Sequence, residues 1–312
     1  MRRAGGYVLF VLGFVLIFMA PLLRWYVVPR VEKAPTDVYS KIVSDGFGRY
    51  FSVKLLSITN TRPLQNIQIY KGNPAASTKD DIVVSAFSRL YDTSDSTNLS
   101  YSQETYVFDR NTGVAVHCCG ENPRHEGETL KFPFGTKKVT YPLYDDMAQK
   151  AFPAPYVRTE ALGGLQTYVF ESHVPDTFVG NMENVPGSLV NQPDTPSVTA
   201  PKHYMADTTV WIEPTTGAVI KGQRRAIQWL TDDNGQFGSM LADVNVEYNP
   251  ATVQSNVDQY SKKAKQLRMV STSVPIFGPI AGAIMIVVGL LLLRTPTRGR
   301  TKPAAEPAMA AG

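Results

Sequence analysis

Two long runs without a charged side chain stand near the two ends of the chain. Residues 4–23 and residues 274–293 are each twenty residues long and contain no Asp, Glu, Lys or Arg. A helix rises about 1.5 Å per residue, so either run could cross the roughly 30 Å of a bilayer's hydrocarbon. A core helix of a soluble protein keeps a polar stripe, which neither run has. The pattern therefore predicts two transmembrane helices.

The first run has an alternative interpretation as a cleaved signal peptide, because Arg2 and Arg3 form a basic segment in front of it. The apolar run is longer than a usual signal sequence, and no small-x-small cleavage site follows it. Pro21 is followed instead by the bulky residues 22–25. We therefore expect an uncleaved anchor.

Basic residues beside the two runs predict the orientation, because cytoplasmic flanks are enriched in Lys and Arg. Residues 1–3 carry two arginines, and the Pro- and Ala-rich tail 294–312 carries four basic residues against the single acid Glu306. We expect both tails to be cytoplasmic, and residues 24–273 to lie on the outer side of the plasma membrane.

Between the anchors, apolar and polar residues mostly alternate with the period of two that is typical of half-buried strands. Clusters of Gly, Pro, Asn and Asp separate the alternating segments, and apolar runs of helical period are nearly absent. We therefore predict a mainly β (α+β) domain with an antiparallel sheet or a barrel-like closure. The expected strands are 51–58, 64–70, 81–90, 165–174, 218–230 and 240–248.

One local pattern occurs twice, at residues 106–116 and 210–220. Each copy has an aromatic-rich strand, an acid, a Thr-Gly pair and a returning apolar segment. We predict two hairpin turns that begin at Asp109 and Glu213, in which Gly113 and Gly217 adopt positive φ. A duplicated sheet half and two ordinary hairpins explain the repeat equally well.

Three segments depart from the strand pattern. Residues 145–152 favour a short helix capped by Asp145, and residues 174–204 have no clear period and predict a long loop. Such a loop would be a lid, a contact surface or a solvated linker. Asn249 and Pro250 are typical of a helix start, so we expect a juxtamembrane helix over 249–269.

Aromatic and basic residues beside the two predicted spans would contact the outer lipid headgroups. This collar is either ordinary interfacial anchoring or a site that recognises an anionic lipid. Its members are Arg24, Trp25, Tyr26, Arg30, Lys262, Lys263, Lys265 and Arg268.

Composition then excludes several classes of function. The formal net charge of the 312 residues is only +4, and the two basic tails supply more than this, so the exported segment is close to neutral. A nucleic-acid-binding surface would need a basic face, and we expect no nucleic-acid partner. The chain has 2 Cys, which excludes a disulfide-dense scaffold.

The two cysteines are adjacent, Cys118 and Cys119, within the polar segment His117–His125 (HCCGENPRH). In an oxidising compartment they could close a small-ring vicinal disulfide that serves as a rigid turn. Free or intermolecular thiols are a second interpretation, and metal or redox chemistry is a third. Neighbouring thiolates chelate one tetrahedral ion poorly, so we predict no metal site.

Catalytic motifs are missing from the sequence. It has no Gly-rich phosphate loop, no G-x-S-x-G and no HExxH. Three acid pairs are expected to be solvated turns or caps; they are Asp80/Asp81, Asp145/Asp146 and Asp232/Asp233. We predict no catalytic residues and no cofactor, and expect the protein not to be an enzyme.

Four segments together carry a resemblance to a known family. They are DRNTGVAVHCCG (109–120), KFPFGTKKVTYPLYDD (131–146), GGLQTYVFESHVP (163–175) and WIEPTTGAVIKG (211–222). With the two anchors, they resemble the actinobacterial PorA-type family, formerly catalogued as a domain of unknown function. The resemblance implies a two-pass cell-envelope protein, with some relatives implicated in lipoglycan maturation. It carries over no catalytic residue.

A domain held at both ends near a membrane suits the binding or presentation of a lipid or lipid-linked glycan in envelope assembly. The alternatives are a structural scaffold for envelope-assembly enzymes and an oligomeric pore, as the family label suggests. Neither predicted span offers a polar face for a pore lumen. The small residues Gly278, Ala281, Gly282 and Gly289 indicate instead a seam between the two helices of one chain. The oligomeric state does not follow from the sequence.

Overall fold

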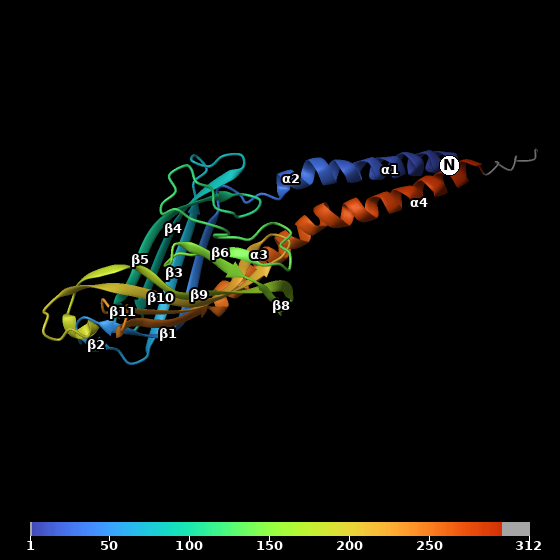
Figure 1. The fold of residues 1–312 in the computed structure, drawn as a ribbon. Helices are drawn as coiled ribbons and strands as arrows, with labels where there is room; N and C mark the ends of the chain where they lie inside the picture. Colours follow the sequence, from blue (N-terminus) through green and yellow to red (C-terminus); the bar gives the residue numbers. More distant parts are fainter. Residues whose placement is uncertain (1, 295–312) are drawn as a thin grey trace, which may run out of the picture. The chain divides into compact units, whose positions relative to one another are not determined.

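The computed structural model describes residues 2–294 and divides the chain into two compact units (Figure 1). A helical unit comprises Met1–Pro29 and Met269–Gly312, of which the parts within 2–294 are described, and a sheet unit comprises Arg30–Arg268. Each unit is described by itself below. The predicted tail 294–312 lies outside the described residues except for Arg294.

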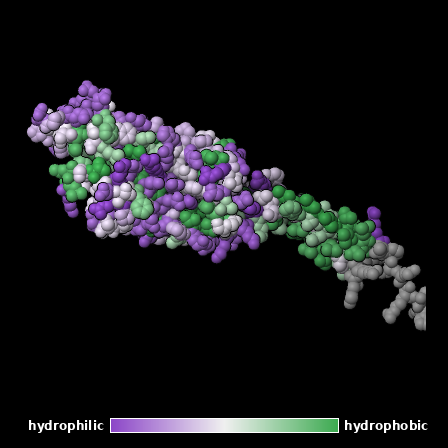
Figure 2. All heavy atoms as spheres, turned by 90° about the horizontal axis from the view of Figure 1, so that it is seen from below, coloured by the Kyte–Doolittle hydropathy of each residue, from purple (hydrophilic) through white to green (hydrophobic). Residues whose placement is uncertain are grey.

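The helical unit contains the two apolar runs. Helix α1 (Arg2–Leu22) continues into the π-helical turn η1 (Leu23–Val27) and into α2 (Val28–Val31). The π-helical turn η3 (Met269–Ser273) leads into α4 (Val274–Arg294). Both helices are long and apolar enough to cross a membrane, and hydrophobic residues dominate their surface (Figure 2). The first helix extends to Val31, beyond residue 23 where the sequence predicted its end.

Glycines bring α1 and α4 together. A Cβ on Gly13 would lie 2.5 Å from the Gly282 carbonyl oxygen, and a Cβ on Gly289 would lie 2.8 Å from the Gly6 oxygen. The helices therefore run antiparallel at a separation that larger residues would prevent. The predicted seam is confirmed at Gly282 and Gly289. A Cβ on Gly278 would lie 3.7 Å from the nearest atom, the Leu16 oxygen, so the contact there is not close.

The sheet unit is one large antiparallel sheet in the order β5-β4-β3-β1-β12-β11-β10-β9-β8, with the short β2 paired to β1. Within the described residues β5 and β8 do not pair, so the sheet is open and is not a closed barrel. The ten strands are β1 (Tyr39–Ser52), β2 (Ser57–Ile58), β3 (Arg62–Gly72), β4 (Asp81–Asp92), β5 (Asn98–Asp109), β8 (Tyr156–Leu162), β9 (Leu165–Val185), β10 (Val198–Glu213), β11 (Ala218–Thr231) and β12 (Phe237–Tyr248).

Residues 110–155 cover one face of this sheet, which we call the inner face. This segment includes the two-stranded sheet of β6 (Tyr141–Asp145) and β7 (Lys150–Ala154). Apolar clusters form where it meets the large sheet. Phe132 and Leu143 pack with Phe170 of β9 and Ile212 of β10, while Tyr144 packs with the buried residues of β4 and β5. The main core therefore lies between the inner face and this covering segment.

The two repeated turns share one geometry. The Asp109 carboxylate accepts the backbone N–H groups of Asn111 and Thr112 at 3.0 and 2.7 Å. The Glu213 carboxylate accepts those of Thr215 and Thr216 at 3.0 and 2.8 Å. Each acid thus caps its turn in the same way.

The glycines that close these two turns lie against two consecutive residues of the covering segment, Lys131 and Phe132. Gly113 and Gly217 have φ of 85° and 72°. A Cβ on Gly113 would lie 2.3 Å from the Lys131 oxygen, and a Cβ on Gly217 would lie 1.9 Å from the Phe132 oxygen. The KFPF segment therefore lies against both turns.

The expected helix at 145–152 is wrong. Asp145 caps a tight turn instead, where its carboxylate accepts the N–H groups of Met147 and Ala148 at 3.1 and 2.9 Å, and β6 and β7 pair on either side. A helix of only eight residues forms few hydrogen bonds to offset the cost of ordering its backbone. The hairpin instead places Leu143 and Phe152 opposite one another on paired strands.

The expected loop at 174–204 is also wrong over most of its length. Strand β9 continues to Val185 and β10 begins at Val198, so only residues 186–197 lack strand structure, and these include the 3-10 helix η2 (Gly187–Val190). Three register shifts interrupt the β9–β10 pairing. Each bulge exchanges the inward and outward sides of a strand, which removes the period of two that would have indicated strands.

The segment 51–58 is not one strand. β1 ends at Ser52 and β2 starts at Ser57, and residues 53–56 form the turn between them. The strands expected at 64–70, 81–90, 218–230 and 240–248 are confirmed as β3, β4, β11 and β12.

The helix expected at 249–269 is present as α3 (Pro250–Arg268). The Asn249 side chain caps it by accepting the Thr252 N–H at 2.8 Å, and Val257 packs against Ala218 and Ile220. Helical backbone is continuous from Pro250 to Arg294, whereas the sequence pattern predicted two separate helices there.

Candidate functional site

A cluster of charged and aromatic side chains interrupts the apolar packing of the inner face. Arg224 of β11 donates to the Asp145 carboxylate and to the Asp146 carboxylate, each at 2.6 Å. The hydroxyl of Tyr204 on β10 donates to Asp145 at 2.9 Å and accepts from Arg224. The β6–β7 turn therefore places two carboxylates against one guanidinium.

The Arg224 group holds its charge despite its surroundings. Burial lowers the pKa of Arg224, but Asp146 and Asp145 outweigh it and hold that pKa well above the ordinary value. Burial likewise raises the pKa of Asp146, and Arg224 outweighs it so that the pKa is lowered. The contacts thus favour a charged pair inside the sheet unit.

Solvent nevertheless reaches this cluster. The side chains of Arg224 and Asp146 are 31% and 39% exposed, whereas that of Asp145 is only 6% exposed. The Nε atom of Arg224 is buried without a hydrogen-bond partner among the described residues. The prediction that the pair Asp145/Asp146 is a solvated turn or a cap is confirmed for the cap, because Asp145 accepts the N–H groups of Met147 and Ala148. The Asp145 side chain itself is buried.

Two tyrosines on β3 and β12, the strands on either side of β1, complete the cluster. Desolvation is the main cause that raises the pKa of Tyr70 on β3 well above its usual value, and it also raises the pKa of Tyr248 on β12. The charge of Asp146 also raises the pKa of Tyr70 and that of Arg224 lowers it, so these groups lie near one another. Both tyrosines are only half-buried. We call Tyr70, Asp145, Asp146, Tyr204, Arg224 and Tyr248 the inner polar cluster.

The inner face around this cluster carries further polar side chains. Glu104 of β5 and Arg224 point to the same face as Tyr70, as the strand registers require. The half-buried side chains of the same parity on these strands are Asn66, Gln68, Ser88, Ser102, Thr208 and Gln228. Such a surface can hydrogen-bond a hydroxyl-rich molecule through both donors and acceptors.

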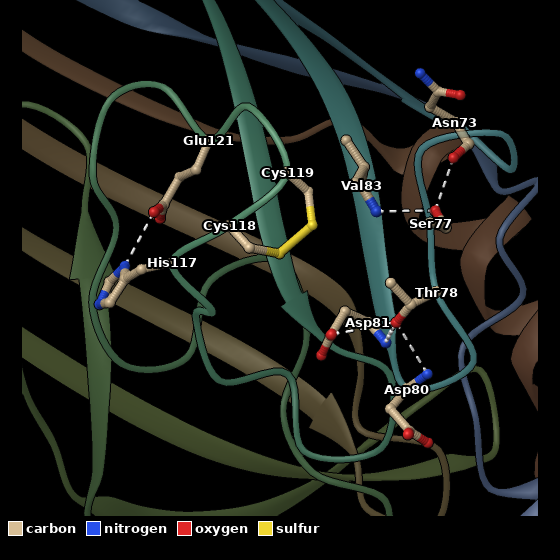
Figure 3. The surroundings of a disulfide bond; sticks show 10 residues. All are labelled: Asn73, Ser77, Thr78, Asp80, Asp81, Val83, His117, Cys118, Cys119 and Glu121. Atoms are coloured by element: carbon tan, nitrogen blue, oxygen red, sulfur yellow. Dashed lines mark hydrogen bonds and ion pairs between the residues drawn. A yellow bond between two sulfur atoms is a disulfide. The ribbon is translucent and has the colours of Figure 1, made fainter.

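A second group of ionisable residues surrounds the adjacent cysteines. Cys118 and Cys119 form a disulfide, and Cys119 has φ of 59°. His117 and Glu121 point toward one another and away from the two sulfur atoms, with His117 Nδ1 2.9 Å from the Glu121 carboxylate (Figure 3). The disulfide and the histidine therefore do not form one site.

The same Glu121 links His117 to a buried histidine. His125 is fully buried, with Nδ1 3.1 Å from Glu121 and Nε2 3.4 Å from Glu104. Its ring centroid lies 3.9 Å from that of Tyr106. Within residues 2–294, no three His, Cys, Asp or Glu side chains are arranged to hold a metal ion.

A buried acid and a half-buried base that the sequence did not single out lie in the covering segment. Burial raises the pKa of Glu128 to about 7, and burial lowers the pKa of Lys131 to about 7. One Glu128 carboxylate oxygen is buried without a partner among the described residues, and Lys131 donates to the Asn111 carbonyl at 2.8 Å. These groups support the fold beside the Asp109 turn.

The opposite face of the sheet carries a shallow pocket of about 210 Å³. Arg49 and Arg225 share the Asp243 carboxylate there at 3.3 and 3.4 Å. The remaining lining residues are Phe47, Gly48, Thr61 and Asn245. Arg225 follows Arg224 in the chain, so these neighbours serve opposite faces of one strand.

The predicted headgroup collar is divided between the two units. Arg24, Trp25 and Tyr26 belong to the helical unit, whereas the other members belong to the sheet unit; they are Arg30, Lys262, Lys263, Lys265 and Arg268. Arg268 donates to the Thr215 hydroxyl at 3.2 Å, which ties it to the second repeated turn. The collar remains a prediction.

The comparisons with known proteins agree with one another. The family model described as Porin PorA matches residues 5–291. A protein named Porin PorA from Corynebacterium resistens is 21% identical over 400 residues, covering 94% of this chain and 97% of that protein. Another Porin PorA, from Corynebacterium amycolatum, is 22% identical over 211 residues, covering 57% of this chain and 55% of that protein.

A search of solved structures adds only a distant likeness. A candidate lipoprotein from Parabacteroides distasonis matches 69% of this chain and 96% of its own at 8% identity, with a TM-score of 0.22 that carries no argument. The match of the family model to residues 5–291 shows that this chain belongs to the Porin PorA family.

Proposed function

We propose that this protein is a two-pass membrane protein of the cell envelope whose sheet unit binds the glycan part of a lipid-linked glycan at the inner polar cluster. The two apolar helices support the membrane anchorage. The basic residues of segments 1–3 and 294–312 support cytoplasmic termini and an exported sheet unit. The carboxy-terminal fusion of a phosphatase that is active only outside the cytoplasm tests this orientation, and activity would contradict it.

The partial exposure of the inner polar cluster carries the binding proposal. A closed core would bury apolar side chains at these positions, because charged groups inside a protein are costly unless they are paired. Arg224 and Asp146 are paired, yet each keeps roughly a third of its side-chain surface open to solvent. A charged pair held rigidly at an accessible inner surface is suited to hydrogen-bond a polar ligand.

The chemistry of the surrounding residues favours a sugar over an acyl chain. Sugar hydroxyls both donate and accept, and they match the mixed carboxylate, guanidinium, amide and hydroxyl groups of this face. Tyr70 and Tyr248 are half-buried, and the exposed parts of their rings can pack against the C–H faces of a sugar.

Native mass spectrometry of the full chain, purified in detergent from an actinobacterial envelope, tests the proposal. We expect a bound mass whose fragments include hexoses. The variant Ser102→Trp places a bulky ring on the inner face and should remove that mass, whereas Gln103→Trp points to the opposite face and should keep it. A chain without a bound glycan, or one that both variants retain equally, would overturn the proposal.

The binding role implies that the protein is not an enzyme, which remains a proposal. The Asp145–Arg224–Asp146 arrangement holds both carboxylates in ion pairs with the guanidinium, which supports a binding role. A purified chain that released sugar or lipid from the bound glycan over time would contradict this expectation.

A pore is the second candidate, because the family and both relatives carry the name Porin PorA. The glycine seam joins α1 and α4 within one chain, so a channel would need several copies around a shared lumen. Planar-bilayer recordings of the full chain separate the candidates. Discrete conductance steps that Gly13→Leu abolishes would favour the pore.

A further inference from the structure

The shallow pocket on the face opposite the inner polar cluster, which we call the outer pocket, receives its side chains from three adjacent strands. Asn245 of β12 lies opposite Phe47 of β1 on one side and opposite Arg225 of β11 on the other. In the next row of the same face, Asp243 lies opposite Arg49. Residues directly opposite in antiparallel strands have Cβ atoms about 5 Å apart. An aromatic ring, an amide, a carboxylate and two guanidiniums therefore lie side by side.

Phe47 leaves its ring open to solvent. It is 65% exposed, and within residues 2–294 no ring or cation contact joins it to another residue. Other aromatic rings of the same face are covered. The Arg89 guanidinium lies 4.5 Å from the centre of the Tyr91 ring. The Lys221 ammonium lies 4.5 Å from the centre of the Trp211 ring. The Phe47 ring is thus free to pack against a ligand.

Polar groups beside the ring are available for hydrogen bonds. The Asn245 amide and the Thr61 hydroxyl make no side-chain hydrogen bond to any described residue. Asp243 is shared by Arg49 and Arg225 at 3.3 and 3.4 Å, longer than the roughly 2.8 Å typical of charge-assisted bonds. Each guanidinium has five N–H donors, so most of them are unused in these loose pairs. The outer pocket therefore offers donors and acceptors next to one another.

The charges of this face argue against an acidic ligand. Arg49 and Arg225 face the single carboxylate of Asp243 in the outer pocket. Further charged side chains on neighbouring positions of the same face supply three carboxylates and one ammonium; they are Asp45, Asp207, Glu247 and Lys221. His173, which lies 2.7 Å from Asp207, adds at most one more positive charge. The face therefore has no excess of positive charge that would attract a phosphate or a carboxylate.

This combination favours one class of ligand. A sugar has C–H faces that pack on an aromatic ring, and its hydroxyls both donate and accept hydrogen bonds. An apolar ligand would remove water from Asp243 and Arg225 without replacing their hydrogen bonds, which costs free energy. The volume of about 210 Å³ is below the roughly 300–1,000 Å³ of pockets for drug-sized molecules, so it suits one sugar residue.

We propose that the outer pocket binds one neutral sugar residue of a glycan chain. The sugar ring packs on Phe47, and its hydroxyls hydrogen-bond Asp243 and Asn245. The site faces the other side of the sheet from the inner polar cluster, and the proposal stands whether or not a glycan binds there. Because the outer pocket is shallow, its ligand exchanges rapidly and does not remain bound through purification.

Saturation-transfer difference NMR of the full chain in lipid nanodiscs tests the proposal, since the method detects weak binding. The neutral probes are the methyl glycosides of glucose, mannose, galactose and arabinose, and the acidic probes are glucuronate and glucose 6-phosphate. We expect transfer to the C–H groups of at least one neutral glycoside and severalfold weaker transfer to both acidic sugars. Transfer no greater than from empty nanodiscs for all four neutral probes, or stronger transfer to an acidic probe, would overturn the proposal.

Two variants on the same face locate the binding. Phe47→Ala removes the ring and should lower the affinity for the neutral glycoside about fivefold. Tyr101→Ala is the matched control, because Tyr101 is 63% exposed on the same face but lies on β5, three strands from β1. Both side chains are mostly exposed, so neither variant should disturb the fold. Equal losses from the two variants, or full affinity in Phe47→Ala, would overturn the proposal.

The variant Ser102→Trp separates the outer pocket from the inner polar cluster. It adds a bulky ring on the inner face only, so the affinity for the neutral glycoside should be unchanged. Loss of binding in Ser102→Trp together with full binding in Phe47→Ala would place the sugar on the inner face. That result would overturn this proposal and leave the proposed function intact.

Discussion

Arg224 and Asp145 lie 79 residues apart in the chain, yet the guanidinium donates to the carboxylate at 2.6 Å on the inner face of the sheet. The pair connects β11 to the turn between β6 and β7. It holds the covering segment against the sheet and, at the same time, presents charge to the solvent that reaches the inner face.

Loss of the Arg224 charge should destabilise the protein. Arg224→Met leaves the Asp145 and Asp146 carboxylates without a counter-charge. Breaking a buried pair costs about 3–5 kcal/mol, and partial exposure reduces the expected loss to about 2 kcal/mol in the free energy of unfolding. Denaturant titration of the full chain in detergent measures this loss.

Arg225→Met is the matched control for that variant. Arg225 is the next residue, faces the other side of the strand and has a 56% exposed side chain, so its loss should cost less than about 0.5 kcal/mol. Equal losses from both variants would show that the inner pair has no special role in stability.

The repeated turns predict a position-specific effect of adding one methyl group. Gly217→Ala would bring a Cβ to 1.9 Å from the Phe132 oxygen at a positive φ, so it should cost about 3 kcal/mol. Gly235→Ala has a similar φ of 76° but no atom within 4 Å, and it should cost only about 1 kcal/mol. Thermal unfolding of the two variants checks the difference, and similar midpoints would contradict the close contact.

Burial of Glu128 predicts a dependence of stability on pH. The folded protein raises the pKa of Glu128 from 4.5 to about 7, so the folded state binds this proton more tightly than the unfolded state. The stability contributed by the protonated carboxyl is fully present below pH 4.5 and is lost as pH rises to about 7. In Glu128→Gln this fall in the free energy of unfolding should disappear, and an unchanged slope would refute the assignment.

Lys131 contributes with the opposite slope over a higher range. Its pKa is lowered from 10.5 to about 7, so the unfolded state binds this proton more tightly. Between pH 7 and 10.5 the unfolded state carries a proton on Lys131 that the folded state does not. Raising the pH makes that proton harder to keep, so the free energy of unfolding should rise across this range. Lys131→Met should remove this rise, as measured by denaturant titration across the range.

The disulfide between adjacent residues should add little to global stability. A cross-link stabilises mainly by closing a loop in the unfolded chain, and Cys118 and Cys119 enclose none. We expect Cys118→Ala with Cys119→Ala to change the free energy of unfolding by less than about 1 kcal/mol and to keep the bound glycan. Loss of the glycan in this variant would indicate a functional role for the disulfide.

Local patterns predicted the membrane helices, α3, most strands and the residues of the repeated turns. These features depend on neighbours in sequence: uncharged runs, alternation and turn chemistry. The segment 174–204 was missed because its bulges change the side-chain alternation, and residues 53–56 were assigned to a strand because their apolar composition favours one. Here an exposed turn uses residues that are typical of a buried strand.

The inner polar cluster could not be derived from spacing, because its members come from β3, β6, the β6–β7 turn, β10, β11 and β12. One local signal was available. Arg224 and Arg225 are adjacent in a strand, and neighbouring side chains of a strand point to opposite faces. One of the two arginines therefore had to lie on the covered face, where a charge requires a partner such as Asp145.

Photo-crosslinking in living cells tests the central claim most directly. A benzophenone amino acid replaces Ser102 on the inner face in one chain and Gln103 on the opposite face in another, and the full-length proteins are isolated after irradiation. The account predicts a covalently attached, hexose-containing lipid at position 102 and none at position 103. Attachment at position 103 alone, equal attachment at both positions, or no attachment at position 102 would contradict it.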